Sequence, residues 1–280
     1  MINPLLLKHP FFYLKKKLCK YRYKYGLIPD NVSELEKEFN GIKFIFDLSL
    51  GPYIKKMYYG LYELKVKEAM KKYLKRGGVF LDIGANIGYL SAIGASLVGK
   101  DGVVHSFEPV PEYFKYLSKL VELNPDYNIV INNFALGESR DSACLNVAGQ
   151  SKIGSNSMVP NFIPEDLVKT TITVPVQRLD RYTEENNLSC PSLIKVDVEG
   201  FELPVLKGAS ALFQQSKDKL PLVIVEITPS VNEQSNKDIA ELEELMFGFG
   251  YKSYCTLGRH PIDIKKIYHQ TDVLFKQETF

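Results

Sequence analysis

The stretch VFLDIGANIGYL at residues 79–90 decides the fold of this chain. An apolar run ends at Asp82, a tight turn with the pattern Gly-x-Asn-x-Gly follows, and a helix of small residues begins. Such a turn leaves backbone N–H groups unpaired at the helix start, where a polar ligand can approach. Dinucleotide-binding turns have glycine at the first, third and sixth positions, whereas Asn86 stands third here. Asp82 would repel phosphate and suits a ligand with an ammonium and a sulfonium, which favours S-adenosylmethionine over NAD.

The next predicted strand supports the same ligand. Residues 102–107 read GVVHSF, a run typical of a buried strand, and Glu108 and Pro109 end it. An acid at the tip of the second strand, about twenty residues beyond the glycine turn, is where a carboxylate grips a ribose diol. We therefore expect Glu108 to bind the ribose. The alternative is that Glu108 only caps the helix that begins near Pro111.

Composition gives the broad class. The 280 residues are 45% apolar and 24% charged, as in an ordinary globular protein, and the net charge of +2 indicates no polyanionic partner such as nucleic acid. Four cysteines lack metal or redox spacing, which predicts a reducing compartment. No apolar run is long enough for a membrane span, and the start lacks a signal-peptide core. We expect a cytoplasmic protein whose oligomeric state is open.

The first twenty-five residues differ from the rest of the chain because they carry seven basic residues and no acid. Aromatic residues are interleaved with Lys8, Lys15, Lys16, Lys17, Lys20, Arg22 and Lys24. Such a segment could lie on an anionic membrane surface or bind nucleic acid. It could equally be a docking helix whose tyrosines pack on the main domain while its lysines face water. The apolar positions are not cleanly segregated, which favours the docking helix.

The chain divides into an N-terminal basic and aromatic helical cap (1–55) and a larger domain (56–280). In the larger domain, predicted strands alternate with helices, which implies parallel strands joined by right-handed crossovers. The fold class is therefore α/β, a Rossmann-like doubly wound, mostly parallel seven-stranded sheet. The expected strands are 79–83, 102–107, 128–133, 193–197 and 222–227, with an antiparallel edge hairpin at 251–255 and 271–276. The expected helices are 57–75, 87–98, 111–123, 202–213 and 236–248.

An insertion of about 136–190 interrupts the alternation before the fourth strand. It has strand-like pieces at 143–147 and 170–178, and the polar sequence GQSKIGSNS lies between them at 149–157. A long loop inside a compact domain is usually a lid or a recognition element. We therefore assign Ser155, Asn156 and Ser157 as candidate substrate contacts.

The second informative stretch is IKVDVEGFE at residues 194–202. Ligands of doubly wound sheets bind at the carboxyl ends of the strands, near the topological switch point. Asp82 and Asp197 would face each other there, and Glu199 begins the next loop. Asp197 or Glu199 could receive the proton of a hydroxyl acceptor during methyl transfer, in which alignment can supply about 7–11 kcal/mol of the barrier. The alternative is that Glu199 and Glu202 cap the following helix.

Together these motifs closely resemble the FkbM family of S-adenosylmethionine-dependent methyltransferases. The likeness rests on DIGANIG (82–88), FEP (107–109) and IKVDVEGFE (194–202), with GLYE (60–63), VPVQRLD (174–180) and LKGA (206–209) as flanking pieces. It runs from about residue 55 to 228, and the first and last 50 residues fit no strong pattern of the family. The resemblance implies O-methylation of a hydroxyl on a sugar, glycan or polyketide-type small molecule.

The resemblance also implies which residues hold the cofactor. Asp82, Gly84, Ala85, Asn86, Gly88, Glu108 and Asp197 would line its site. Asn133, followed by Ala135, stands where such enzymes contact adenine, and Glu63 would close over the methionine moiety. Glu226, at the tip of strand 222–227, is a further candidate on the substrate side.

Other classes fit less well or stay open. A nucleic-acid amino-methyltransferase should have Asn/Asp-Pro-Pro-Tyr after the fourth strand, which residues 197–200 lack, and a cytosine C5 enzyme needs Pro-Cys, which Cys190-Pro191 reverses. Asp197, Glu199 and Glu226 could form an all-oxygen Mg²⁺ site, so a metal-dependent O-methyltransferase stays possible but is not favoured. A non-catalytic cofactor-binding scaffold should have a degraded cofactor crevice, and the main positions are intact. A lipid-linked glycan acceptor is the better hypothesis if the basic segment binds a membrane surface.

Overall fold

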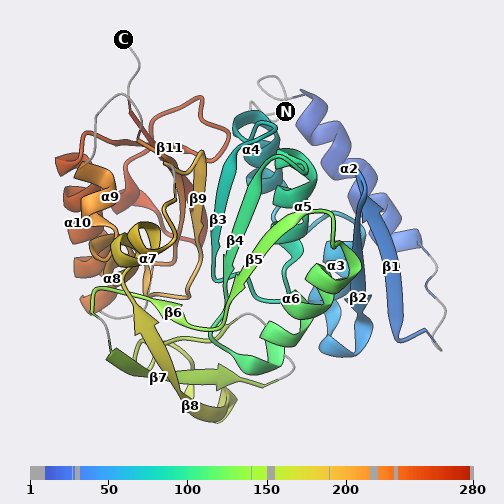
Figure 1. The fold of residues 1–280 in the computed structure, drawn as a ribbon, viewed down its shortest axis with the longest axis horizontal. Helices are drawn as coiled ribbons and strands as arrows, with labels where there is room; N and C mark the ends of the chain where they lie inside the picture. The colour runs from blue at the N-terminus through green and yellow to red at the C-terminus, as the bar shows by residue number, and fades with distance from the viewer. Residues whose placement is uncertain are drawn as a thin grey trace.

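The computed structural model describes residues 10–26, 28, 32–139, 141–149, 155–188, 190–214, 220–229 and 233–277. Its main element is a seven-stranded sheet with the order β11-β12-β10-β9-β3-β4-β5 (Figure 1). These strands are β3 (Val79–Ile83), β4 (Val103–Phe107), β5 (Asn128–Asn132), β9 (Leu193–Val196), β10 (Leu222–Ile227), β11 (Lys252–Cys255) and β12 (Thr271–Lys276). β12 pairs antiparallel with both of its neighbours, and the other pairs are parallel. The predicted Rossmann-like sheet with an antiparallel edge hairpin is confirmed.

Helices cover both faces of this sheet because its central strands are apolar on both sides (Figure 1). Phe80 and Leu81 show the alternation along β3, since each belongs to a different core. The core around Phe80 includes α4 (Leu64–Tyr73), α5 (Tyr89–Val98) and α6 (Pro111–Leu123). The core around Leu81 includes α7 (Leu179–Glu185), α8 (Glu202–Lys207), α9 (Ser210–Gln214) and α10 (Glu233–Gly248).

Two predicted helices are divided in the structure. The expected helix 57–75 is replaced by α3 (Pro52–Tyr58) and α4, with a turn at 59–63 between them. The expected helix 202–213 is divided into α8 and α9 at Gly208, where a Cβ atom would lie 2.1 Å from the carbonyl oxygen of Gly137. The short helix α7 was not predicted.

The N-terminal cap is only partly helical, which corrects the prediction. Helix α2 (Pro10–Tyr25) is present, but β1 (Glu34–Phe39) and β2 (Ile42–Asp47) form an antiparallel hairpin. Asn40 and Gly41 make its two-residue turn with φ values of 48° and 93°, the geometry that favours Asn-Gly. Phe44 and Phe46 are buried and pack against the ring of Tyr89 on α5.

Helix α2 lies along the outside of the molecule beside β1 (Figure 1). Its inner side reaches the 57–68 region, where Tyr23 makes an edge-to-face contact with Tyr59 and Lys15 forms an ion pair with Glu68. Lys8 lies outside the described residues. Among the described helices, none combines the length and apolar character needed to cross a membrane.

The insertion forms a separate three-stranded sheet, as its strand-like pieces predicted. Its strands are β6 (Ala135–Leu136), β7 (Asp141–Ala148) and β8 (Val168–Gln177), in the order β6-β8-β7. Residues 150–154 of the predicted polar loop lie outside the described residues, but Ser157 pairs with Asn146 of β7 through two backbone hydrogen bonds. This pairing holds Ser157 against the edge of the three-stranded sheet.

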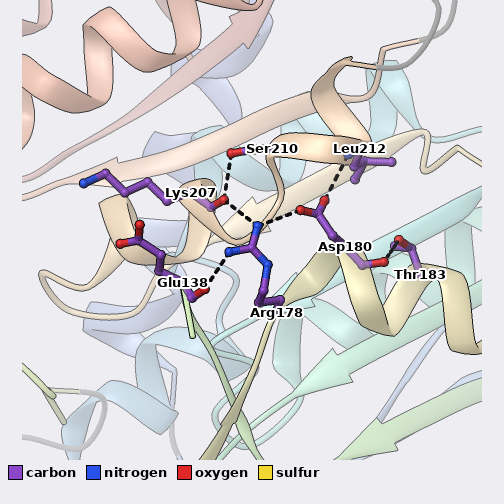
Figure 2. Close-up of polar contacts among 7 residues, drawn as sticks. All are labelled: Glu138, Arg178, Asp180, Thr183, Lys207, Ser210 and Leu212. Carbon is purple, nitrogen blue, oxygen red and sulfur yellow. Dashed lines mark hydrogen bonds and ion pairs between the residues drawn. The ribbon is translucent and has the colours of Figure 1, made fainter. Parts of the chain in front are cut away.

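A partly buried polar cluster joins the insertion to the helices α7, α8 and α9, and Figure 2 shows its members. Arg178 donates to the carbonyl oxygens of Glu138 (2.6 Å) and Lys207 (3.3 Å) and pairs with the Asp180 carboxylate at 3.0 Å. Asp180 also accepts from the Leu212 backbone N–H at 3.0 Å. We call these residues the Arg178 cluster. The VPVQRLD and LKGA motifs therefore meet here and have a structural role.

Candidate active site

The glycine turn between β3 and α5 has the backbone geometry that its sequence predicted. Gly84 and Gly88 both have φ of 84°, in the left-handed region that favours glycine. A Cβ at Gly84 would lie 1.8 Å from the carbonyl oxygen of Asp197, so β9 passes directly beside the turn. Asn86 also has a positive φ, 52°, and its side chain accepts from the Ile87 N–H. The N–H groups of residues 84–88 all have partners within the protein, so the predicted unpaired N–H groups are not found in this turn. Gly84 and Asn86 nevertheless line the cavities described below.

Glu108 lies where the sequence placed it, at the tip of β4. Its carboxylate accepts the Asn86 N–H and the Val110 N–H, each at 2.8 Å. Val110 is the residue before α6, and that helix has no side-chain cap, so the capping alternative is not borne out. The ribose role of Glu108 stays a prediction. Burial raises the pKa of Glu108 to about 7, although these hydrogen bonds lower it.

A narrow cavity of about 50 Å³ opens between this turn and the insertion. Its walls combine apolar side chains with Glu108, Asn86 and Asp197. The apolar part comes mostly from the end of β4 and from the insertion: Phe107, Val110, Phe134, Ala135, Leu136, Leu145 and Met158. Such walls suit a flat, mostly apolar ring held near one carboxylate. Sequence reasoning found Ala135 but not the surrounding apolar residues.

Four predicted cofactor residues are absent from the walls of both cavities at this end of the sheet: Asp82, Ala85, Gly88 and Asn133. Asp82 is buried and accepts a hydrogen bond of 2.5 Å from the Ser91 hydroxyl of α5. Burial raises its pKa to about 6. Asn133 is exposed and donates to the carbonyl oxygen of Glu108 at 2.9 Å. The Asp82 contact therefore joins β3 to α5, and the Asn133 contact supports the segment that carries Glu108.

A second cavity of about 300 Å³ adjoins the first at the carboxyl ends of the central strands. The two cavities share Gly84, Asn86, Asp197 and Glu199. Five carboxylates line the second cavity, from the start of α4, the loop after β9, β10 and β12: Glu63, Asp197, Glu199, Glu226 and Asp272. We call these five the acidic cluster.

Lys195 is the buried cation beneath this cluster. Its side chain is fully buried, and its ammonium lies 3.2 Å from Asp197 and 3.0 Å from Asp272. Burial alone would lower the pKa of Lys195, but the surrounding carboxylates raise it well above its ordinary value. One permanent positive charge therefore stands against five acidic groups in this part of the structure.

Three of the acids hold protons more tightly than they would in water. Burial raises the pKa of Glu63 to about 8, and the neighbouring Asp272 adds to the effect. Burial, with Asp197 as a further cause, raises the pKa of Glu199 to about 8 and that of Glu226 to about 10. A cation that enters the cavity would stabilise the ionised forms and release protons.

The loop after β9 gives its two glutamates different roles. Glu202 is buried, and its carboxylate accepts the N–H groups of Val198 and Gly200, each at 3.1 Å. Glu199 has φ of 51° and lines both cavities, while its carbonyl oxygen accepts the Ser157 hydroxyl at 2.6 Å. Glu202 therefore holds the loop that precedes α8 and does not cap that helix through its side chain, whereas Glu199 lines both cavities.

The structure also places the candidate substrate residues of the insertion. Ser155 lines the acidic cavity, and Asn156 lines the narrow one while its side chain accepts the Ala148 N–H at 3.0 Å. Ser157 is fully buried, and its hydroxyl holds the Glu199 loop. Its assignment as a substrate contact stays a prediction, and its observed contact is structural.

The three acids that the metal-dependent alternative requires, Asp197, Glu199 and Glu226, lie close together in the structure. One carboxylate oxygen from each lies within 4.8 Å of the others. Oxygen ligands at this spacing suit a hard divalent cation. The Lys195 ammonium, however, already lies 3.2 Å from Asp197.

Sequence reasoning missed Tyr62 and Asp272, which line the acidic cavity. Tyr62 stands beside Glu63 in the GLYE motif, so the motif itself could have indicated it. Asp272 lies directly opposite Glu226 in the antiparallel pair of β10 and β12. That neighbourhood depends on strand register, and no local pattern in residues 260–280 indicates it.

A family comparison identifies the class of this protein. The model of the methyltransferase FkbM domain matches residues 82–253, more than half of the chain. The chain belongs to the FkbM methyltransferase family. The match covers the glycine turn, the Glu108 tip and the Asp197 loop, and it confirms the resemblance stated from the sequence.

Curated and solved relatives are more distant. Hexuronic acid methyltransferase AglP of Haloferax volcanii is 27% identical over 164 residues, which are 59% of this chain and 60% of AglP. The chain thus spans less than two thirds of that relative. Among solved structures, a putative rRNA-methylase from Clostridium thermocellum is 12% identical with a TM-score of 0.43, over 75% of this chain and 90% of that one. Aeropyrum pernix fibrillarin with bound S-adenosyl-L-methionine is 11% identical with a TM-score of 0.39, over 91% and 86%.

Proposed function

We propose that this methyltransferase transfers a methyl group from S-adenosylmethionine to a hydroxyl of a sugar, glycan or similar small molecule. The observation that carries the proposal is the acidic cluster, whose five carboxylates surround one lysine next to the glycine turn. A site with excess negative charge favours a cationic ligand. S-adenosylmethionine carries a sulfonium and an ammonium against one carboxylate, so it matches this charge.

The two adjoining cavities divide naturally between the parts of the donor. The narrow apolar cavity suits adenine, with Glu108 at its rim to bind the ribose diol. The shared residues Gly84, Asn86 and Asp197 would then lie beside the sulfonium, and Glu63 would approach the methionine ammonium. The remaining space of the acidic cavity, beside Glu199 and Glu226, is left for the acceptor.

Bound S-adenosylmethionine supplies a methyl group on a positively charged sulfur. As the acceptor oxygen forms its bond to that carbon and the carbon–sulfur bond breaks, the hydroxyl loses its proton. We assign Glu199 as the proton acceptor and Asp197 as the group that orients the hydroxyl. A carboxylate with a pKa near 8 is a stronger base than an exposed one, and the donor cation favours its ionised form.

The charge of the cavity also distinguishes between acceptor groups. The name of AglP states that it methylates a hexuronic acid, and such a sugar offers hydroxyls and a carboxylate. In this chain an acceptor carboxylate would lie near Asp197, Glu199 and Glu226. Asp197 would repel it, and Glu199 and Glu226, whose pKa values burial raises to about 8 and about 10, would repel it once they ionise. A neutral hydroxyl avoids this repulsion, so an ether is the expected product.

Metal dependence is a second candidate because Asp197, Glu199 and Glu226 have oxygens within 4.8 Å of one another. A divalent cation there would bind the acceptor oxygen and make its proton easier to remove. Full activity of chelator-treated protein in buffer with EDTA would exclude this mechanism. Activity restored only by Mg²⁺ or Mn²⁺ would establish it and would replace Glu199 as the base.

The experiment that tests the proposal uses S-adenosylmethionine labelled on its methyl group and a panel of neutral sugars, uronic acids and amino sugars. Mild alkali distinguishes the products, because a methyl ester releases methanol and a methyl ether does not. Alkali-stable label on a neutral sugar is the expected result. Label found only on carboxylates or amines would contradict the hydroxyl assignment.

A further inference from the structure

Helix α2 has an unusual outer face. Of the nine large hydrophobic residues that are exposed in the described chain, five lie on this single helix: Phe11, Leu14, Leu18, Tyr21 and Tyr25. Their spacing of three and four residues places them in one stripe along one side of the helix. Phe11 is 86% exposed and Leu14 is 68% exposed, so the stripe is open along its length. We call these five residues the apolar stripe.

The opposite side of α2 is the side that packs on the protein. Tyr23 contacts Tyr59, Lys15 pairs with Glu68, and the Cys19 sulfur lies near Gly60. The docking-helix interpretation of the sequence therefore accounts for one face only. The apolar stripe is on the other face, and the described residues of this structure do not cover it.

Basic residues flank the apolar stripe, and no acid interrupts it. Lys17, Lys20 and Lys24 lie on one side of the stripe, Arg22 lies on the other, and all four are exposed. The sixteen residues of α2 contain six basic residues and no Asp or Glu. Two tyrosines also belong to the stripe, and tyrosine is enriched where apolar lipid meets water.

We propose that α2 docks on an anionic membrane surface, with the apolar stripe in the interfacial region and its flanking lysines and Arg22 against the lipid headgroups. Charge complementarity selects this occupant. A second copy of the chain seated on the stripe would bring two rows of lysines together without a compensating acid. An anionic bilayer supplies both the apolar layer and the negative charge that this helix face lacks.

The test is co-sedimentation of the intact protein with phosphatidylcholine vesicles that contain or lack phosphatidylserine. We expect binding to the anionic vesicles, little binding to the neutral ones, and weaker binding as salt increases. Leu14→Glu with Leu18→Glu should weaken binding about tenfold or more, because each change removes buried apolar area and adds repulsion. Phe247→Glu, an apolar-to-acid change at an exposed position of α10, is the control for the change of chemistry and should bind like the parent.

A triple change of Lys17, Lys20 and Lys24 to Gln should lower the affinity for anionic vesicles by about fivefold for each lysine removed. It should also remove most of the salt dependence of binding. Three results would overturn the proposal. The intact protein could fail to bind anionic vesicles, the Leu14→Glu, Leu18→Glu variant could bind as well as the control, or sedimentation equilibrium could show a dimer that this variant dissociates. Vesicle binding needs no acceptor, so the test is independent of the proposed transfer reaction.

Discussion

The Arg178 cluster and the acidic cluster are both partly buried and polar, but they differ in charge balance. Around Arg178, one guanidinium meets one carboxylate, and backbone carbonyls and an N–H group take the remaining hydrogen bonds (Figure 2). Around Lys195, one ammonium meets five acidic groups. A cluster in which positive and negative charges are equal needs no further ligand in the folded protein. A cluster with an excess of carboxylates must either keep some of them protonated or bind a cation.

This difference separates a structural cluster from a candidate functional one within the same protein. The Arg178 cluster joins β8 to the turns around α8 and α9, so its groups have fixed partners. The acidic cluster lies at the carboxyl ends of β9 and β10 and at the amino end of the antiparallel β12. Doubly wound sheets bind ligands at the carboxyl ends of their parallel strands. Substitutions in the first cluster should therefore reduce stability, and substitutions in the second should change ligand binding and turnover.

The largest expected effect follows Asp197→Asn, which keeps the side-chain volume and removes the charge. We expect kcat/KM for methyl transfer to fall by about 10²–10⁴-fold, because the acceptor loses its orienting carboxylate. Lys195 keeps Asp272 as its partner, so the fold should remain intact. Steady-state kinetics with circular dichroism on the same sample measures both quantities.

Asp180→Asn is the matched carboxylate-to-amide control in the Arg178 cluster. It should lower stability with little change in kcat/KM. Equal losses of activity in the two variants would mean that the clusters do not differ in role.

Lys195→Met should lower the free energy of unfolding by about 3–5 kcal/mol, because it leaves buried carboxylates without their cation. The pKa values of Glu63, Glu199 and Glu226 are raised, so these acids are neutral at low pH and need no cation there. The loss of stability should therefore be smaller at low pH than at pH 8. Urea unfolding at both pH values provides the measurement. A loss independent of pH would show that the lysine stabilises through packing alone.

Arg178→Gln should lower the free energy of unfolding by about 1–3 kcal/mol, since Asp180 and two carbonyl groups lose their donor. The KM for S-adenosylmethionine should stay unchanged. A large rise in this KM without a change in stability would mean that the balanced cluster also positions the cofactor site.

Ser157→Ala should have the smallest effect. It removes the hydrogen bond that the hydroxyl donates to the carbonyl oxygen of Glu199 and the one that it accepts from the Val159 N–H, and it should cost about 1–2 kcal/mol of stability. A several-fold fall in kcat at unchanged donor affinity would show that the bond to its carbonyl oxygen positions Glu199. An unchanged kcat would leave Ser157 with a purely structural role.

Much of the fold was predictable because its signals are local. The glycine turn, the apolar strands and the alternation with helices each depend on a short run of residues. The missed hairpin also had a local signal, since Asn40-Gly41 lies between alternating apolar residues. The expectation of a helical cap outweighed that signal.

The site was predictable only where residues follow the strand tips in sequence. Asp197, Glu199 and Glu226 line the cavity as expected. Asp82 also lies near a strand tip, but its carboxylate accepts a hydrogen bond from the Ser91 hydroxyl on α5. This contact depends on how α5 packs against the sheet. Asp272 joins Glu226 through strand register across about forty-five residues of chain, which only the folded structure reveals.

The most direct test of the cation-binding claim compares S-adenosylmethionine with its neutral-sulfur product, S-adenosylhomocysteine, by calorimetry from about pH 6 to pH 8. Glu63 and Glu199 have pKa values of about 8, so they are mostly protonated at the lower pH and ionise as pH rises. We expect protons to be released when S-adenosylmethionine binds. We also expect its affinity relative to that of S-adenosylhomocysteine to increase with pH. Equal affinities for both ligands across this range, with no difference in proton release, would contradict it.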